Sequence, residues 1–338
     1  MPLLAGIGAG PVAFKTMSLR FRLVLIWLAA ALLPAGALAA VAPLLSPAEL
    51  QALLGREPVR VIDTREAPAY ALQHLPGAVS APYARWRGPA SNPGQLPSLP
   101  ALTALVRELG LTPETHAVIV YGGTDSTDFG SAARVYWTLK SLGMTRLSIL
   151  NGGLMAWKAA RLPVSQQPAQ VAPSDWQPRL HTRWMATQDE VQGQLGRSEV
   201  LLVDSRPAAF FQGRKQHAAA RALGSLPGAV NLDSDLFFEP GSAALMPLPA
   251  LDAEAAALDE RPHQATVTFC NTGHWAATDW FVLSEVLGRP DVRLYPGSMV
   301  EWTRAPQPLP MVNEPDRLGQ LRYMLASWSH RNLGTKAP

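Results

Sequence analysis

Cysteine is almost absent from this sequence, because Cys270 is the only one among its 338 residues. A single thiol cannot form an internal disulfide, which excludes a small scaffold held together by disulfides. Charged residues are also scarce, at 16%, while 48% of the residues are hydrophobic, and this composition excludes an intrinsically disordered chain. The sequence further lacks metal-ligand spacing, a dinucleotide-binding glycine pattern and a phosphate-binding P-loop. We therefore expect no metal and no other cofactor.

An excess of charge of either sign is missing as well, once residues 1–42 are set aside. The net charge is +3, and this first segment contains Lys15, Arg20 and Arg22 but no acidic residue. The rest of the chain is therefore neutral and offers no electrostatic attraction to a polyanion. We expect no nucleic-acid partner.

The N-terminus has the order of features typical of a secretory signal peptide. Arg20 and Arg22 precede the apolar run Leu23–Leu33, and Ala37-Leu38-Ala39 then offers small residues at the cleavage positions. We predict a signal peptide over residues 1–39, with Met17 as an alternative start, and a periplasmic or secreted protein. The alternative is an uncleaved N-terminal anchor, for which an apolar stretch of about 20 residues is barely long enough.

The remainder of the chain repeats itself once, with matching segments about 145 residues apart. The pairs are 59–65 with 200–206, 75–79 with 226–230, 117–121 with 265–269, and 150–153 with 294–297, the last pair followed by Trp157 and Trp302. Because order and spacing are kept, we predict a tandem duplication of one domain.

Each copy alternates short β-branched runs with helical stretches. The runs Val59–Ile62, Ala117–Tyr121, Val200–Val203 and Thr266–Phe269 are typical of buried parallel strands. Helices are predicted over 100–109, 132–142 and 276–287. This alternation predicts an α/β fold in which each domain has a central parallel sheet with helices on both faces.

The predicted organisation follows from these patterns and from proline-rich breaks. A Cys-less first domain covers 43–163, a linker 164–182, a second domain 183–310 and a C-terminal tail 311–338. The tail has a helical patch near Leu318–Trp328, which either packs onto the body or forms a partner surface.

Cys270 opens a loop between a predicted strand and a predicted helix, and the loop continues Asn271-Thr272-Gly273-His274-Trp275-Ala276. Ligands of open α/β folds bind at the carboxyl ends of strands, where inward-facing backbone N–H groups stabilise anions and lower a thiol pKa. We predict that Cys270 is a nucleophile, that the amides of residues 271–276 stabilise its thiolate and the departing anion, and that Gly273 permits the tight curl. The alternative is a buried cysteine at the end of a strand.

The sequence resembles the two-domain rhodanese family of thiosulfate and 3-mercaptopyruvate sulfurtransferases, over residues 46–163 and 184–310. The motifs that carry the resemblance are Asp204-Ser205-Arg206, Leu226–Asn231 and Cys270-x-x-Gly273 in the second half, with Arg134–Trp137 and Leu150–Gly153 in the first. The resemblance implies tandem domains of which the second is catalytic. It also implies that the Cys270 thiolate takes a sulfane sulfur from a small donor, holds it as a persulfide and passes it to a thiol or cyanide acceptor.

In the first copy the position of the cysteine falls at Gly122, in a loop about three residues longer than the Cys270 loop. Without a thiol this domain cannot form a persulfide, so we expect it to have a structural or substrate-shaping role. Related phosphatases need an arginine where Ala276 stands, which makes phosphate-ester hydrolysis an unlikely activity. The family residue at the sixth loop position is polar, but here it is Trp275. A family arginine falls at Phe210, with Arg214 nearby but not aligned.

These departures leave the donor open and keep two other hypotheses: a periplasmic sulfur-carrier or redox-partner binding module with little turnover, and a non-catalytic scaffold. A periplasmic sulfur-accepting protein is a further expected partner. His274 either titrates near neutral pH and assists the thiolate or binds an anionic substrate, or it is an exposed loop residue. Trp275 is either a pocket wall or a helix cap.

Four charged groups are expected to be mainly structural or solvated. Asp204 and Arg206 are read as a fold-holding pair that supports the site, because Asp63 and Arg65 recur in the Cys-less copy. Asp279 and Glu285, on the helix after the loop, are expected to be solvated helix charges.

Overall fold

The computed structural model describes residues 41–333, so the predicted signal peptide, its cleavage site and the alternative anchor lie outside the described residues. Within that range, no helix combines the length and the hydropathy needed to cross a bilayer.

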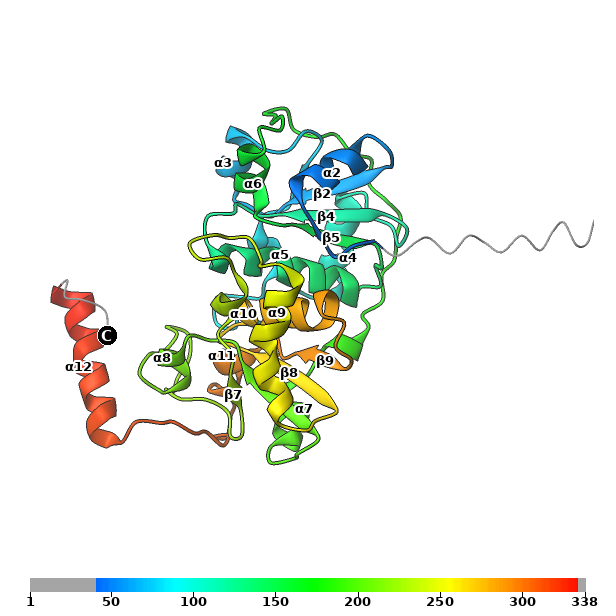
Figure 1. Ribbon diagram of the computed structural model, residues 1–338. Helices are drawn as coiled ribbons and strands as arrows, with labels where there is room; N and C mark the ends of the chain where they lie inside the picture. The colour runs from blue at the N-terminus through cyan, green and yellow to red at the C-terminus, as the bar shows by residue number, and fades with distance from the viewer. Residues whose placement is uncertain (1–40, 334–338) are drawn as a thin grey trace, which may run out of the picture. The chain divides into compact units, whose positions relative to one another are not determined.

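A five-stranded parallel sheet organises the first half of the described chain, in the order β1-β5-β4-β2-β3 (Figure 1). Its strands are β1 (Leu44–Leu45), β2 (Val59–Asp63), β3 (Val79–Ser80), β4 (His116–Val120) and β5 (Leu147–Leu150). Every residue of the central strand β4 is buried, as expected for a strand covered on both faces.

A four-stranded parallel sheet organises the second half, in the order β7-β6-β8-β9. Its strands are β6 (Val200–Asp204), β7 (Val230–Asn231), β8 (Ala265–Phe269) and β9 (Val292–Leu294). Met185 extends this sheet beyond β9 by a parallel bridge to Leu294. The bridge corresponds to the pairing of β1 with β5 at the edge of the first sheet.

The helices of the first half are α2 (Pro47–Leu54), α3 (Ala67–Leu72), the 3-10 helix η1 (Tyr83–Trp86), α4 (Leu99–Glu108), α5 (Ser126–Ser141) and α6 (Gly153–Ala159). Three of them, α2, α4 and α5, are capped at their N-terminus by a side chain. Ser46 and Glu49 form a reciprocal capping box before α2, and Asp125 caps α5 by accepting the N–H of Asp128.

The second half has a similar order of helices. They are the 3-10 helix η2 (Thr182–Trp184), α7 (Gln188–Gln194), α8 (Ala208–Phe211), η3 (Ser234–Phe237), α9 (Leu248–Ala255), η4 (Ala256–Glu260), α10 (Trp275–Trp280), the π-helix η5 (Phe281–Val286), α11 (Ser298–Trp302) and α12 (Arg317–Leu333). The predicted helix over 276–287 is thus an α-helix that continues into a π-helix, and the predicted tail helix is part of α12.

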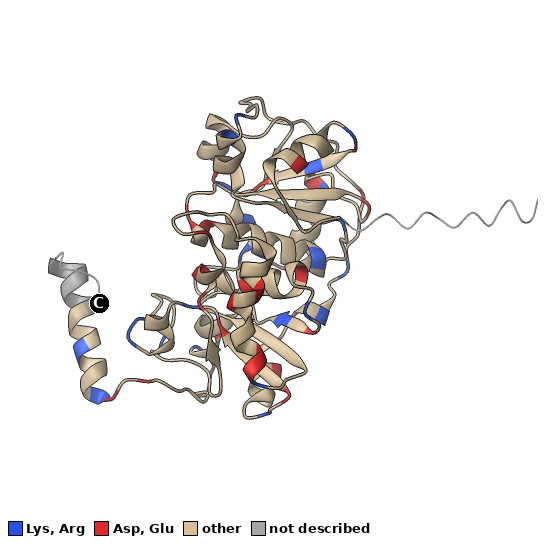
Figure 2. Ribbon diagram, viewed as in Figure 1, with Lys and Arg blue, Asp and Glu red and all other residues tan. Residues whose placement is uncertain are grey.

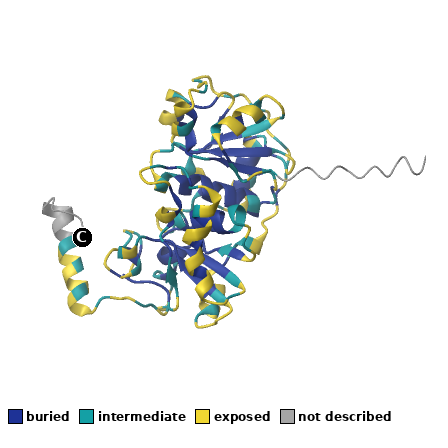
Figure 3. Ribbon diagram, viewed as in Figure 1, coloured by how far each residue is buried: buried dark blue, intermediate teal, exposed yellow. Residues whose placement is uncertain are grey.

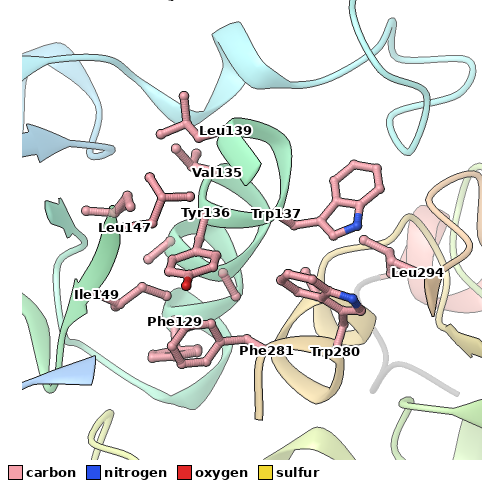
Figure 4. Packing of buried hydrophobic residues seen from close by; sticks show 14 of the residues in the cluster. Phe129, Val135, Tyr136, Trp137, Leu139, Leu147, Ile149, Trp280, Phe281 and Leu294 are labelled. Atoms are coloured by element: carbon pink, nitrogen blue, oxygen red, sulfur yellow. The ribbon is translucent and has the colours of Figure 1, made fainter. Parts of the chain in front are cut away.

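The two halves share one hydrophobic core. Helices α5 and α10 pack together between the two sheets, and Phe281 contacts Phe129 and Tyr136 edge to face, with ring centroids 5.6 and 5.0 Å apart (Figure 4). Buried side chains from both sheets join this cluster, while a smaller separate cluster covers the outer face of each sheet. Figure 3 shows the resulting pattern, with buried strands inside and exposed helices such as α7 outside.

The predicted tandem α/β fold is confirmed: two parallel sheets are each flanked by helices on both faces. Basic and acidic side chains are interspersed over both halves (Figure 2). Residues 164–181, where the linker is predicted, contain no helix or strand, although Ser165 exchanges two backbone hydrogen bonds with His74.

The sheet register corrects the predicted match between the two copies by one residue. Val120 pairs with Asp63 as Phe269 pairs with Asp204, so Tyr121, not Gly122, stands at the cysteine position of the first domain. The prediction of a longer first loop is also wrong, because residues 121–125 and 270–274 both run from the end of a strand to the start of a helix. The sequence match was off by one residue because two short apolar segments can be aligned almost equally well after a shift of one position.

Candidate active site

Cys270 lies directly after β8, one of the two central strands of the second sheet. Only 1% of its surface is exposed, so the thiol is buried beneath the loop that it opens. Asn271 and Thr272 are also buried, at 3% and 7% exposure, and the helix that follows starts at Trp275. The loop therefore encloses the thiol at the carboxyl edge of the sheet, where ligands of parallel sheets bind.

Ser298 closes the loop from inside. Its Oγ accepts hydrogen bonds from the N–H groups of Cys270 and Gly273, both at 3.1 Å, and donates to the carbonyl of Tyr295 at 2.8 Å. Its backbone has a φ of +53°, a conformation that costs a non-glycine residue about 1–2 kcal/mol. The equivalent residue of the first domain is Gly153, with a φ of +57°. Sequence reasoning missed Ser298, although a serine replacing a glycine in the repeat is a signal for it.

Gly273 is required by the loop geometry. Its φ is +64°, and a Cβ there would collide with Nη1 of Arg134 and approach the carbonyl of Pro296 to 2.6 Å. In the described chain, the N–H groups of Asn271, Thr272 and His274 have no protein partner. Unpaired amides at the mouth of a buried thiol are suited to stabilise negative charge.

The predicted pair Asp204–Arg206 lies against this loop. Nη2 of Arg206 is 2.6 Å from Oδ2 of Asp204, and Nη1 donates to Oδ1 of Asn271 at 3.4 Å. Ser225 also donates to Asp204, at 2.6 Å, so the buried carboxylate is fully engaged. The pair thus holds the position of the loop without reaching the thiol.

Arg214 is not brought to the loop. Its guanidinium donates to Oε1 of Gln212 in the same exposed segment, at 2.6 and 3.0 Å.

The first domain supplies three side chains to the loop that sequence reasoning missed. Arg134 of α5 donates to the carbonyl of Gly273 at 3.2 Å, and Arg87 donates to the carbonyl of Thr272 at 3.3 Å. Tyr83 of η1 lies 3.0 Å from Nδ1 of His274. No spacing in the sequence indicates these contacts, because they arise from the docking of one domain on the other.

His274 hydrogen-bonds to the first domain through both of its ring nitrogens. Its Nε2 lies 2.7 Å from the carbonyl of Thr127, which can only accept, so Nε2 carries the proton and Nδ1 accepts from the Tyr83 hydroxyl. Burial, together with the nearby charge of Arg87, lowers the pKa of His274 to about 4. The ring is therefore neutral near pH 7 and is held against the first domain.

Trp275 is half-buried and packs against Phe210, with ring centroids 5.8 Å apart in an edge-to-face arrangement. Lys215 places its Nζ 5.4 Å from the Phe210 ring. Phe210 and Trp275 thus form an aromatic contact next to the loop. Ala276 is buried, and its carbonyl accepts from Thr268 at 2.9 Å.

Asp279 and Glu285 are not solvated helix charges, which corrects the prediction. Asp279 is completely buried next to Ser205, and burial raises the pKa of its carboxyl well above the ordinary range. Glu285 accepts hydrogen bonds from Tyr136 and Lys140 of α5, at 2.8 and 2.7 Å. The helix lies between the two domains, so the side that would face water in a lone domain faces a partner instead.

The corresponding loop of the first domain is already occupied. Oδ2 of Asp128 accepts the N–H groups of Gly123 at 2.8 Å and Thr124 at 3.3 Å. The equivalent of Asp128 in the second domain is Ala277, which has no charge. The first loop therefore binds a carboxylate of its own chain. Across the described residues, no group of three or more histidine, cysteine or acidic side chains is placed to hold a metal ion.

Comparison with known proteins agrees with this geometry. The model of the "Rhodanese-like domain" family matches residues 46–160 and again 187–305. The chain is 33% identical to a thiosulfate sulfurtransferase of Azotobacter vinelandii over 263 residues, covering 78% of this chain and 94% of that protein. It is 31% identical to a probable 3-mercaptopyruvate sulfurtransferase of Pseudomonas aeruginosa over 289 residues, covering 79% and 96%.

Among solved structures, SseA from Escherichia coli, described as a 3-mercaptopyruvate sulfotransferase, is similar with a TM-score of 0.66 and 23% identity. The likeness covers 76% of this chain and 99% of SseA. YnjE is similar with a TM-score of 0.70 and 23% identity, covering 80% of this chain and 68% of that chain. At these identities the two structures show a shared fold.

Proposed function

The chain belongs to the rhodanese-like family, and on that premise we propose that it transfers a sulfane sulfur from a small donor to a thiol or cyanide acceptor through a persulfide on Cys270. It is a sulfurtransferase. The observation that carries the proposal is a lone thiol that opens a loop with unpaired N–H groups at the carboxyl end of β8.

The first half-reaction loads the enzyme. The Cys270 thiolate attacks the sulfane sulfur, a bond forms between that sulfur and Sγ, and the bond to the rest of the donor breaks. The departing group keeps the electron pair, as sulfite from thiosulfate or as the enolate of pyruvate from 3-mercaptopyruvate, which then takes up a proton. The N–H groups of Asn271, Thr272 and His274 have no partner in the described chain and are available to stabilise the charge that develops in this step.

The second half-reaction unloads the enzyme. A thiolate or cyanide attacks the terminal sulfur of the persulfide, and Sγ of Cys270 leaves as the thiolate. One cysteine is sufficient for both halves.

Relatives named for thiosulfate and for 3-mercaptopyruvate both match the chain, so the proposal covers both donors. We further propose that the protein acts after export, on the signal-peptide pattern of residues 1–39, and that a sulfur-accepting protein of the same compartment is a partner.

The intact mass of the mature protein tests the chemistry. Wild type incubated with thiosulfate or 3-mercaptopyruvate should gain the mass of one sulfur atom, and cyanide should discharge it. Cys270→Ser should gain nothing with either donor. An adduct that persists in Cys270→Ser would refute the role of Cys270, and the relative yields rank the donors.

A sulfur-carrier or redox-partner binding module is the second candidate. It is favoured by the 1% exposure of Cys270 and by the packing of Phe210 on Trp275, where polar substrate-binding groups are expected. Steady-state turnover with small donors and cyanide would exclude it, whereas a persulfide that forms once and turns over only with a protein acceptor would support it.

A further inference from the structure

Arg87 of the first domain reaches the Cys270 loop with only neutral partners. Its Nε donates to the carbonyl of Pro93 at 2.6 Å, Nη1 to the Tyr83 hydroxyl at 2.5 Å and Nη2 to the carbonyl of Thr272 at 3.3 Å. A guanidinium has five N–H groups, so these contacts fix the plane of the group and leave further donors available. The side chain is half-buried, so an external ligand can approach those donors.

Arg134 also contacts the loop and is completely buried. Its Nη1 and Nη2 donate to the carbonyls of Gly273 and Gly94, at 3.2 and 2.6 Å, and its Nε has no hydrogen-bond partner. Burial lowers the pKa of Arg134 to about 10, and the ionised forms of Tyr83 and Cys270 oppose that shift.

Neither charge is neutralised by a carboxylate. Among the residues that the structure describes, no acidic side chain lies within ion-pair distance of Arg87 or Arg134. Burial, followed by the charge of Arg87, lowers the pKa of His217. A histidine side chain carries either no charge or a positive one, so it does not neutralise Arg87. Buried or half-buried charges of one sign without a counter-ion are costly unless an anion joins them.

The first domain shows what the same loop does with an anion. There Asp128 occupies the loop amides of Gly123 and Thr124, whereas Ala277 leaves the second loop without an internal carboxylate. The second loop is thus an anion-binding loop whose anion must come from outside the chain.

We propose that Arg87 and Arg134 of the Cys-less domain complete an anion-binding subsite over Cys270, in which Arg87 contacts the negatively charged head of the sulfur donor and Arg134 positions the loop. The ligand class is a small sulfonate-like or carboxylate anion. This assignment rests on the proposed sulfurtransferase function for its substrate, and it gives the first domain a direct part in the reaction. It also explains why α8 has Phe210 at the position of the family arginine. The first domain supplies the positive charge, so no arginine is needed in α8.

Alkylation of Cys270 by an anionic and a neutral reagent of similar size tests the subsite without any sulfur donor. The rate constant for iodoacetate divided by that for iodoacetamide should be about tenfold lower in Arg87→Gln than in wild type. This difference between the two proteins should be smaller at high salt, because salt screens the charge of Arg87. Arg87→Lys keeps the charge and should keep most of the ratio. Arg85→Gln is the matched control, since Arg85 lies in η1 two residues before Arg87 but pairs with Glu108 at the surface.

The same variants then give the donor dependence. In Arg87→Gln the KM for thiosulfate should rise about tenfold, with a smaller change in kcat. An alkylation ratio that is equal in wild type, Arg87→Gln and Arg85→Gln would overturn the subsite. Wild-type protein that forms no persulfide with either donor, while the alkylation ratio still depends on Arg87, would instead overturn the proposed function and leave the subsite standing.

Discussion

The hydroxyl of Tyr121 donates a 2.6 Å hydrogen bond to the carbonyl of Ala243, which lies in the other domain. The same oxygen accepts the N–H of Gly152 at 2.9 Å, so the hydroxyl both donates and accepts. Tyr121 stands where the second domain has Cys270, and its side chain occupies that position as a bond between domains. The position that we propose for the nucleophile in one copy is a structural contact in the other.

Tyr121→Phe removes this hydroxyl and leaves a buried carbonyl and a buried N–H without their partner. We expect the free energy of unfolding to fall by about 1–3 kcal/mol, measured by chemical denaturation. Persulfide formation at Cys270 should be unchanged in the folded variant. A variant as stable as wild type would show that the two groups find other partners.

The substitution Ser298→Gly distinguishes the effect of the Ser298 hydroxyl from the effect of its strained backbone conformation. Glycine adopts the positive φ without strain, but the N–H groups of Cys270 and Gly273 lose their acceptor. We expect persulfide formation, followed by mass, to slow by about ten- to a hundredfold. Ser298→Ala loses the hydroxyl and keeps the strain, so it should be about 1 kcal/mol less stable than Ser298→Gly. Equal rates in wild type and both variants would contradict a role for the hydroxyl in shaping the loop.

Asp279→Asn should change how stability depends on pH. Burial raises the pKa of Asp279 in the folded protein, so the folded state keeps a proton that the unfolded chain has already lost above about pH 4. Wild-type stability is therefore lost through this group as the pH rises from about 4 toward the folded-state pKa. The melting temperature of Asp279→Asn relative to wild type should increase with pH over that window. A constant difference between pH 5 and 8 would show that Asp279 ionises normally.

His274→Gln should have the opposite dependence. The folded-state pKa of His274 is about 4, below its ordinary value of 6.5, so the unfolded chain binds a proton between these values while the folded protein does not. Wild-type stability therefore falls as the pH drops from about 6.5 to 4, and His274→Gln should reduce this fall. Proton titration of the ring by NMR gives the pKa directly, and a value near 6.5 would refute the buried, neutral assignment.

The strands and the strand-to-helix loop that Cys270 opens were predictable because both follow from local patterns. The apolar runs at Val59 and Ala117 are long enough to identify buried strands, and Cys270 follows such a run directly. The register of one copy on the other was not predictable, because adjacent apolar residues are interchangeable in sequence and only the pairing of β2 with β4 fixes it. That one-residue difference hid both Tyr121 and Ser298.

Contacts made by docking left no trace in the sequence pattern. Arg87 and Tyr83 lie about 185–191 residues from their partners in the Cys270 loop. Asp279 was misread for the same reason, since it is completely buried on a helix that packs between two sheets.

The cluster that joins Phe129 and Tyr136 to Phe281 makes the duplicated protein thermodynamically indivisible. A second domain produced alone would turn the aromatic face of α10 and η5 toward water, and a gene fragment encoding only residues 183–310 would yield an aggregating product. Heat should likewise melt both halves in one calorimetric transition. Neither copy can therefore be removed without exposing the hydrophobic cluster that it shares with the other.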